Sequence, residues 1–313
     1  MPESLDSKIP IGISSCLLGQ KVRFDANHKE QRLITEKLAK NFDFVPVCPE
    51  VAIGLGVPRT PIHLVGDQYA QRAVNVRDES IDVTQKLVEY GVQQVKQLDF
   101  ISGYIFKKGS PSCGLFSVKI YKSKIEVLNG GTGLYAQQII NGNPLLPVEE
   151  EGRLNDGKLR NNFLQRVEVY YRWQQLCSNG LSKNGIVGFH TRHKFMLLAH
   201  CESTYRALGR LIAQIGLGDL DVFAHEYITM LMNGLQKPTS RGKQTNVVEH
   251  LVGFVKADLD AYDKQEMRQL IERYRDGDVP LAALLTLLKH YLRKFPSKYV
   301  TQQYYLNSRY CDL

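Results

Sequence analysis

The chain has 313 residues, of which 43% are hydrophobic and 23% are charged, as in an ordinary globular protein. This length predicts two domains. No apolar run approaches the roughly 18 residues of a membrane-spanning helix, and the polar segment 1–10 lacks a signal-peptide core, so we expect a cytoplasmic protein without a membrane partner. In that compartment a disulfide framework is not expected. The six cysteines include no CxxC pair, which argues against a zinc ribbon or a thioredoxin-type site.

Strand-like and helical patterns alternate through the first half of the chain. Short apolar runs predict strands at about 9–18, 44–48, 64–65, 73–76, 100–106, 116–121 and 145–148. Apolar residues at helical spacing predict helices at about 29–40, 81–98 and 135–140. The glycine-rich segment 130–133 is typical of a flexible turn. This alternation predicts an α/β domain with a mostly parallel, Rossmann-like sheet and helices on both faces.

Three cysteines close strand-like runs of this predicted sheet: Cys16, Cys48 and Cys113. The carboxyl ends of parallel strands meet at one edge, where open α/β sheets bind ligands, so the three thiols could lie together. A single buried cysteine is more often a small apolar core residue. Thiolates that converge without a CxxC spacing suit an iron–sulfur cluster better than structural zinc. Three thiolates on a four-iron cluster would leave one iron open to a substrate atom.

Three motifs around these cysteines resemble the signature motifs of the thiouracil desulfidase family. They are Ser15-Cys16-Leu17-Leu18-Gly19 with Val22-Arg23-Phe24-Asp25, then Val47-Cys48-Pro49-Glu50, then Ser110-Pro111-Ser112-Cys113-Gly114. The similarity runs from about Ile9 to about Arg172. Phe24 stands where many members have tyrosine. The resemblance implies that Cys16, Cys48 and Cys113 hold a 4Fe–4S cluster with three protein ligands, whose open iron takes the sulfur of a thiolated base.

The resemblance also implies roles in proton chemistry for Glu50 and Ser110. Water would attack the ring carbon with Glu50 as general base and later as proton donor, without net redox change. Without a catalytic role, Glu50 would be a solvated carboxylate in a turn, and the Ser110 hydroxyl would stabilise a turn or cap a helix. Four basic residues flank the motifs and are candidates to contact a phosphate or a base, although surface salt bridges would explain them equally well. They are Arg23, Arg59, Lys107 and Lys108.

The second half of the chain has helical periodicity almost throughout. A helix is predicted from Asp156 to Cys177, and Ser178-Asn179-Gly180 interrupts it, so we place the domain boundary there, with domains at 1–179 and 180–313. Further helices are predicted at about 194–215, 219–235, 247–262, 265–275 and 279–295. The C-terminal domain is therefore expected to be all-α.

Charge suggests a polyanionic partner for this helical domain. The net charge is +8 and the pI is about 9.0. Residues 1–180 hold 22 basic and 19 acidic side chains, and the shorter remainder holds 18 and 13. The candidates for RNA contact are Arg206 and Arg210 on one helical face, Arg241 and Lys243 in a basic loop at 238–244, and a tail with Tyr304, Tyr305, Arg309 and Tyr310. Singly, each of these is more often a solvated or core residue.

Four histidines of this half, His190, His193, His200 and His225, raise the possibility of a metal site. No carboxylate or cysteine pattern accompanies them, so we expect structural or surface roles.

The helical half resembles the domain that is often fused to thiouracil desulfidases. In that fused form, the family is associated with removal of sulfur from 4-thiouridine in tRNA. The predicted function is therefore a tRNA 4-thiouridine desulfidase with tRNA as its partner and substrate. One alternative is a desulfidase of free thiouracil. Another is an RNA-binding protein whose cluster is structural or senses redox state.

Overall fold

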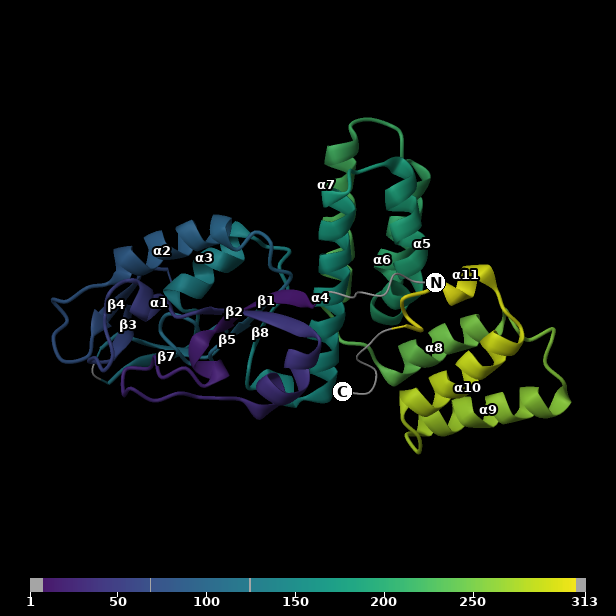
Figure 1. The fold of residues 1–313 in the computed structure, drawn as a ribbon, viewed down its shortest axis with the longest axis horizontal. Helices are drawn as coiled ribbons and strands as arrows, with labels where there is room; N and C mark the ends of the chain where they lie inside the picture. The colour runs from purple at the N-terminus through teal and green to yellow at the C-terminus, as the bar shows by residue number, and fades with distance from the viewer. Residues whose placement is uncertain (1–7, 68, 124, 308–313) are drawn as a thin grey trace. The chain divides into compact units, whose positions relative to one another are not determined.

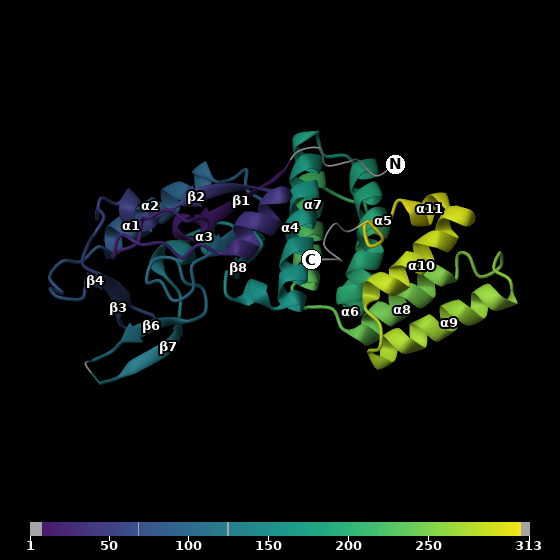
Figure 2. The same ribbon diagram turned by 60° about the horizontal axis from the view of Figure 1, so that its bottom comes forward.

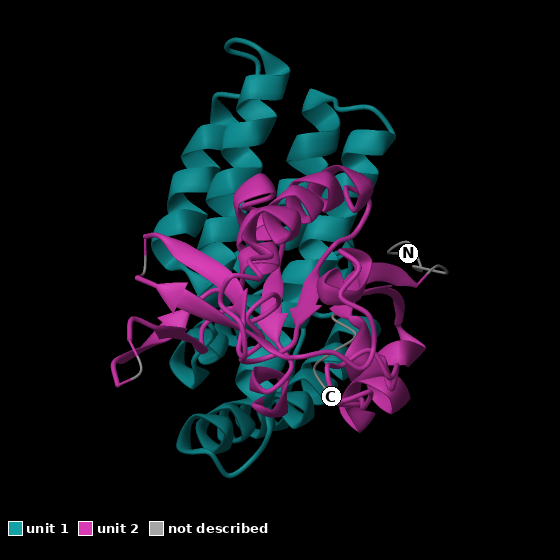
Figure 3. Cartoon of the chain, turned by 90° about the vertical axis from the view of Figure 1, so that its left-hand side faces the viewer, with its two compact units in different colours: residues 1–5, 157–313 teal, residues 6–156 magenta. Residues whose placement is uncertain are grey.

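The computed structural model describes residues 8–67, 69–123 and 125–307. Residues 6–156 form one compact unit, and residues 157–313 belong to a second, which Figure 3 colours separately. The tail residues Arg309 and Tyr310 lie outside the described residues.

The first unit contains an entirely parallel sheet. Its strands are β1 (Ile9–Ser14), β2 (Phe42–Val47), β5 (Tyr104–Phe106) and β8 (Val148–Glu150), in the order β2-β1-β5-β8. Gly12 pairs with Tyr104 across β1 and β5, and a Cβ atom at Gly12 would collide with the Tyr104 ring. Glycine here lets the aromatic ring lie flat on the sheet. The predicted α/β class with a parallel sheet is confirmed.

A second sheet of mixed direction completes the strands of this unit. It consists of β3 (Ile62–Gly66), β4 (Gln71–Asn75), β6 (Val118–Tyr121) and β7 (Val127–Gly131), in the order β4-β3-β6-β7. The strands predicted at 64–65 and 73–76 are present as β3 and β4, which pair antiparallel as a hairpin. The prediction of a flexible turn at 130–133 is wrong at its start, because Gly130 and Gly131 end a strand that pairs antiparallel with β6.

Two helices, α2 (Thr84–Gln97) and α3 (Leu134–Gly142), lie side by side in both ribbon views (Figures 1 and 2). A Cβ atom at Gly91 would lie 2.7 Å from Cβ of Gln138, so glycine permits their close approach. The single helix predicted at 29–40 is instead two short turns, η2 (Leu33–Lys37) and η3 (Leu38–Lys40). Only Ile34 and Leu38 of these turns are buried, so little apolar surface supports a longer helix.

Short helical turns follow β1, β2 and β8. They are η1 (Ser15–Leu18), α1 (Pro49–Ala52) and η4 (Arg153–Asn155). Glu149, Glu150 and Glu151 are 4%, 1% and 6% exposed, so the acidic run after the last predicted strand is buried. Inside the unit, Glu149 pairs with Arg153, Glu150 accepts from the amide of Leu115, and Glu151 pairs with Lys107.

The second unit is all-α within the residues described. Its helices are α4 (Gly157–Ser178), α5 (Lys183–His200), α6 (Glu202–Ala213), α7 (Leu220–Leu235), α8 (Arg241–Val252), α9 (Ala261–Asp276), α10 (Leu281–Lys294) and α11 (Lys298–Thr301). The side chains of Ser182, Asp219, Ser240 and Asp260 cap helix N-termini. Across the described ranges, none of the helices combines the length and apolarity needed to cross a bilayer.

The unit boundary lies at 156/157, whereas the sequence pattern placed it at 179/180. The reason is that α4 packs against α5 and α7, so the break at Ser178–Gly180 is the turn of a helical hairpin. The predicted helix 194–215 is also divided, because Cys201 has an extended backbone with φ −150° and ψ 102°. The predicted basic loop 238–244 is helical from Arg241 onward, because Ser240 caps α8.

Candidate active site

Three thiols line one cavity of about 390 Å³ in the first unit. Cys16 lies in η1 directly after β1, Cys48 is the N-cap of α1 directly after β2, and Cys113 follows β5 in the next loop. Because β2, β1 and β5 are adjacent and parallel, their carboxyl ends meet at one edge. The structure therefore brings together the three cysteines that the sequence singled out.

The thiols lie in a poorly solvated environment. Cys16 and Cys113 are 8% and 5% exposed, and Cys48 is half-buried. Burial, and then the proximity of Cys48, raises the pKa of Cys16 to about 11, and the same two causes raise the pKa of Cys113. Burial also raises the pKa of Cys48. Without a bound cation these groups are neutral thiols, and a metal centre would stabilise them as thiolates.

The chemistry of the donor set fits an iron–sulfur cluster. In the ranges 8–67, 69–123 and 125–307, no three His, Cys, Asp or Glu side chains converge as ligands of one metal ion. Three soft sulfur donors around one cavity are the ligands that iron–sulfur centres use. Cys16, Cys48 and Cys113 are the residues that could hold such a group.

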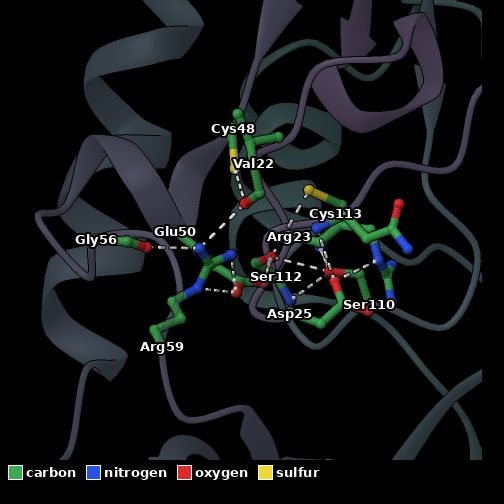
Figure 4. A network of polar contacts seen from close by, with 11 residues as sticks. Val22, Arg23, Asp25, Cys48, Glu50, Gly56, Arg59, Ser110, Ser112 and Cys113 are labelled. Carbon is green, nitrogen blue, oxygen red and sulfur yellow. Dashed lines mark hydrogen bonds and ion pairs between the residues drawn. The ribbon is translucent and has the colours of Figure 1, made fainter.

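Glu50 faces this cavity from α1 and is bound by Arg59 (Figure 4). Nε and Nη2 of Arg59 donate to Oε2 of Glu50 at 3.0 and 2.8 Å. The two side chains are only 6% and 13% exposed. Nη1 of Arg59 donates to the carbonyl oxygens of Val22 and Gly56 at 3.0 and 2.8 Å. This arrangement fixes the carboxylate and leaves Oε1 for other contacts.

Ser112 makes that contact and was not singled out by the sequence. Its hydroxyl donates to Oε1 of Glu50 at 2.7 Å and lies 2.9 Å from Oγ of Ser110 (Figure 4). A carboxylate can only accept, so the Ser112 hydroxyl points at Glu50 and the Ser110 hydroxyl donates to Ser112. Glu50 and Ser110, the predicted catalytic pair, are thus linked through a third residue. The position of Ser112 inside the third cysteine motif is the sequence feature that could have identified it as a site residue.

The turn that carries these serines is tightly held. Gly109 has φ +69°, a conformation that favours glycine. Oγ of Ser110 accepts a hydrogen bond from the amide of Cys113 at 3.2 Å, and Oε1 of Glu150 accepts one from the amide of Leu115 at 2.8 Å. A Cβ atom at Gly133 would collide with the backbone of Ser112. The buried carboxylate and the two glycines fix the direction of the Cys113 thiol.

All four basic residues predicted near the motifs line the cavity, and so does Lys29, which the sequence did not single out. Arg59 is bound to Glu50 as described. Nζ of Lys107 lies 2.5 Å from Oε1 of Glu151, and Nε of Arg23 lies 3.5 Å from Oδ1 of Asp25. Three of the four predicted substrate-binding residues therefore already have a carboxylate partner. The fourth, Lys108, has none among the described residues.

The candidate RNA-binding residues lie in the second unit. Arg206 and Arg210 are exposed on α6, and Arg206 pairs with Glu202 at 2.6 Å. Arg241 lies over the ring of Tyr274 at 6.0 Å, and Nζ of Lys243 donates to the carbonyl oxygen of His200 at 2.6 Å. The RNA role of these residues remains a prediction.

Three of the four histidines are buried in the helical core. Nδ1 of His193 lies 2.8 Å from the Phe189 carbonyl oxygen, and Nδ1 of His200 lies 2.7 Å from that of Lys237. Burial lowers the pKa of His190 and of His200 to about 4. Neutral, hydrogen-bonded rings of this kind have a structural role, whereas His225 is exposed.

Residues 11–151 match the family model of 2-thiouracil desulfurase. The uncharacterized protein YbbK of Bacillus subtilis (strain 168) is 33% identical over 112 residues, which are 33% of this chain and 71% of that protein. The first unit belongs to the 2-thiouracil desulfurase family. The whole cysteine-lined cavity of this desulfurase-family unit lies within the matched residues. The resemblance seen in the three motifs is thereby confirmed at the level of the family.

Other similarities each cover part of the chain. A solved structure described as [4Fe-4S]-dependent thiouracil desulfidase TudS has 29% sequence identity and a TM-score of 0.37, covering 48% of this chain and 95% of that one. Residues 194–309 match the model of a protein of unknown function (DUF1722). The uncharacterized protein YbgA of Escherichia coli (strain K12) is 29% identical over 153 residues, which are 49% of this chain and 90% of that protein.

Proposed function

We propose that this protein is a tRNA 4-thiouridine desulfidase, which replaces the thiocarbonyl sulfur of the base by oxygen. The observation that carries the proposal is one cavity that combines three thiols with the hydrogen-bonded Glu50, Ser112 and Ser110. A soft-metal site beside a proton-transferring carboxylate suits C–S hydrolysis. The reaction consumes one water and releases hydrogen sulfide, and no electrons are gained or lost.

The proposed cofactor is a 4Fe–4S cluster held by Cys16, Cys48 and Cys113. When bound, such a cluster supplies a Lewis-acidic iron for the soft thiocarbonyl sulfur and so weakens the C–S bond. Membership of the desulfurase family and the chemistry of the donor set support this assignment. Burial of the thiols keeps water away from the sulfur ligands and raises the interaction energy of charges within the site.

Proton movement is assigned to the chain's own side chains. Glu50 takes a proton from the attacking water at Oε1. Arg59 holds the other oxygen, Oε2, so that Oε1 stays directed into the cavity. Ser112 can pass a proton between Oε1 and the hydroxyl of Ser110, which lines the cavity. The two protons lost by water can in this way be returned to the departing sulfur.

The choice of tRNA as substrate rests on charge and on the attached helical unit. The net charge of +8 suits a polyanion, and exposed arginines such as Arg210 lie on that unit. The cavity of about 390 Å³ is in the range of small-ligand pockets and suits a single base. A thiolated base within a folded tRNA would have to leave its stack to enter it.

The test is desulfuration by the full chain, reconstituted anaerobically with iron and sulfide. With tRNA that contains 4-thiouridine, the 4-thiouridine absorbance should disappear and sulfide should form. A kcat/KM at least tenfold higher on free thiouracil than on tRNA would instead establish the free base as the substrate. If the cluster forms and neither substrate is converted, the proposal fails.

A further inference from the structure

Three aromatic side chains of the helical unit cluster together, far from the cysteine motifs in the sequence. Phe195 comes from α5, Phe254 from the turn directly after α8, and Tyr299 from α11. The ring centroids of Phe254 and Tyr299 are 5.5 Å apart, and the Phe195 ring meets them edge-on at centroid distances of 6.3 and 6.2 Å. Three separate segments of the unit therefore build one aromatic cluster.

Exposure to solvent increases from one ring of this cluster to the next. Phe195 is 5% exposed, Tyr299 is half-buried and Phe254 is 44% exposed. The first two rings support the Phe254 ring, which presents apolar surface to solvent. Covering such surface with a flat ligand is favourable, because apolar area leaves water and aromatic faces attract one another when stacked. A planar group laid on the Phe254 ring would therefore bind.

The segment that carries Tyr299 is fixed to α5. Nε2 of the fully buried Gln303 donates to the carbonyl oxygen of Thr191 at 2.8 Å. The amide of Tyr304 donates to the carbonyl oxygen of Arg192 at 3.0 Å. The helices α5 and α8 also pack against each other. The aromatic cluster is therefore formed in advance, so that a ligand does not have to order it on binding.

Lysine side chains accompany each part of the cluster. Nζ of Lys194 lies 4.8 Å from the ring centroid of Tyr299, in a cation–π contact. Lys256 and Lys298 are exposed and adjoin Phe254 and Tyr299 in the sequence. In the described ranges 8–67, 69–123 and 125–307, none of these three ammonium groups takes part in an ion pair or a hydrogen bond. Each can therefore bind an anion without giving up a protein partner.

The charge of these segments favours a polyanion as the ligand. Residues 191–197, 252–258 and 296–302 contain four Lys or Arg side chains and one carboxylate, that of Asp258. An ammonium group binds phosphate as a point charge with three donors. Proteins hold single-stranded nucleic acid with bases stacked on aromatic rings and phosphates on nearby cations. An apolar peptide would cover the rings but leave the cations unused, so the combination favours RNA.

We propose that Phe254 and Tyr299 form a stacking platform for an unpaired base of RNA. Lys194, Lys256 and Lys298 contact the phosphates next to that base. This inference rests on the proposed function for its class of ligand, and it specifies that the RNA partner offers an unpaired segment to the helical unit. Every base has a π-face, so the platform tolerates any base and binds RNA before and after desulfuration alike.

The test measures RNA binding by the reconstituted full chain and does not need turnover. The probes are a short single-stranded RNA, its abasic counterpart of the same length, and a duplex of the same sequence. Phe254→Leu removes the π-face but keeps an apolar side chain, so it should weaken binding of the single strand about tenfold, as for one lost base stack. Binding of the abasic strand and of the duplex should change by less than about twofold. Phe254→Trp should bind the single strand at least as tightly as the wild type.

Two further variants separate stacking from charge and from nonspecific surface effects. Lys194→Gln should weaken binding of the single strand and of the abasic strand alike and reduce the salt dependence of both, because it removes a phosphate contact. Tyr262→Ala removes a ring of α9 that is 84% exposed and is the matched control. This control should bind all three probes as the wild type does.

The outcomes for the platform and for the proposed function are distinguishable. An unchanged affinity of the folded Phe254→Leu chain for the single strand would overturn the platform, and so would an equal loss of affinity for the abasic strand. Far-ultraviolet circular dichroism establishes that the variant is folded. A wild-type chain that binds the single strand through Phe254 but releases no sulfide from any thiolated substrate would overturn the proposed function and leave the platform in place.

Discussion

The hydroxyl of Ser112 donates a 2.7 Å hydrogen bond to Oε1 of Glu50, across 62 positions of the sequence. It thereby joins the thiol-bearing turn after β5 to the short helix that begins after β2. Ser112 is 1% exposed and also lies 3.7 Å from Sγ of Cys113. One buried hydroxyl therefore contacts the carboxylate assigned to proton transfer and sits beside a proposed cluster ligand.

Replacing this hydroxyl tests whether it conducts protons. Ser112→Ala should keep the iron content and lower kcat by about tenfold to a hundredfold, since proton transfer by a positioned group contributes factors of this order or more. Ser110→Ala and the double variant should have similar effects, because residues acting as one unit are not additive. Ser80→Ala, outside the cavity, is the control. If the fold-loss of kcat in the double variant equalled the product of the two single losses, the two hydroxyls would act independently, which would contradict proton transfer through both.

The ion pair between Arg59 and Glu50 should stabilise the first unit as well as the site. Arg59→Gln leaves a mostly buried carboxylate and two carbonyl oxygens without their donor, so the free energy of unfolding should fall by about 3 kcal/mol. Arg59→Lys keeps the charge but not the two-nitrogen contact, so a smaller loss is expected. The unfolding transition of the first unit in denaturant measures the loss of stability in both variants. Equal stability of wild type and Arg59→Gln would show that the pair is not structural.

The cysteines separate into three proposed cluster ligands and others that serve as controls. Serine at Cys16, Cys48 or Cys113 should remove most of the iron and sulfide bound after reconstitution and abolish desulfuration. Serine at Cys177 or Cys201, in the helical unit, should leave both intact. Iron content and the visible absorption band report the cluster directly. Full iron binding by the Cys113→Ser chain would refute the ligand assignment.

Cys201 should react faster than Cys177 at neutral pH, these two being the described cysteines of the helical unit. Hydrogen bonds from the hydroxyls of Ser203 and Thr204 lower its pKa to about 7, whereas burial raises the pKa of Cys177. A lowered pKa means that the thiolate forms as the pH rises through 7. The alkylation rate of Cys201 should therefore level off above about pH 8, while that of Cys177 keeps rising. Mass spectrometry of chains alkylated from pH 6 to 9 measures this, and Ser203→Ala with Thr204→Val should move the midpoint upward.

RNA recognition by the helical unit can be tested by charge reversal. Arg210→Glu with Arg241→Glu should raise KM for thiolated tRNA by on the order of tenfold, through lost phosphate contacts. The KM for free thiouracil should not change, because both residues lie outside the cavity. A weaker salt dependence of tRNA binding in the variant would support the assignment. An unchanged KM for tRNA would place the RNA contacts elsewhere.

The sequence was sufficient to predict the architecture and the three thiols. Cys16, Cys48 and Cys113 each follow a recognisable apolar strand, and parallel strands must end at a common edge, so their proximity follows from local patterns. The division into an α/β unit and an all-α unit follows equally from hydrophobic periodicity.

Contacts between distant segments could not be predicted in this way. The bond of Ser112 to Glu50 and the pairing of Lys107 with Glu151 depend on tertiary packing, which hydrophobic periodicity does not report. For the same reason the burial of the run Glu149–Glu151, whose carboxylates hold the loop after β5, could not be read from the sequence. Assignment of α4 to the helical unit likewise depends on its packing against α5 and α7.

The central claim is hydrolytic replacement of sulfur by oxygen in tRNA at this cavity. The most direct measurement is anaerobic turnover of 4-thiouridine-containing tRNA in ¹⁸O-labelled water by the reconstituted full chain. We predict one labelled uridine oxygen for each sulfide released, without any added reductant. Unlabelled product, a requirement for reductant, or retention of all 4-thiouridine by an iron-loaded chain would contradict the account.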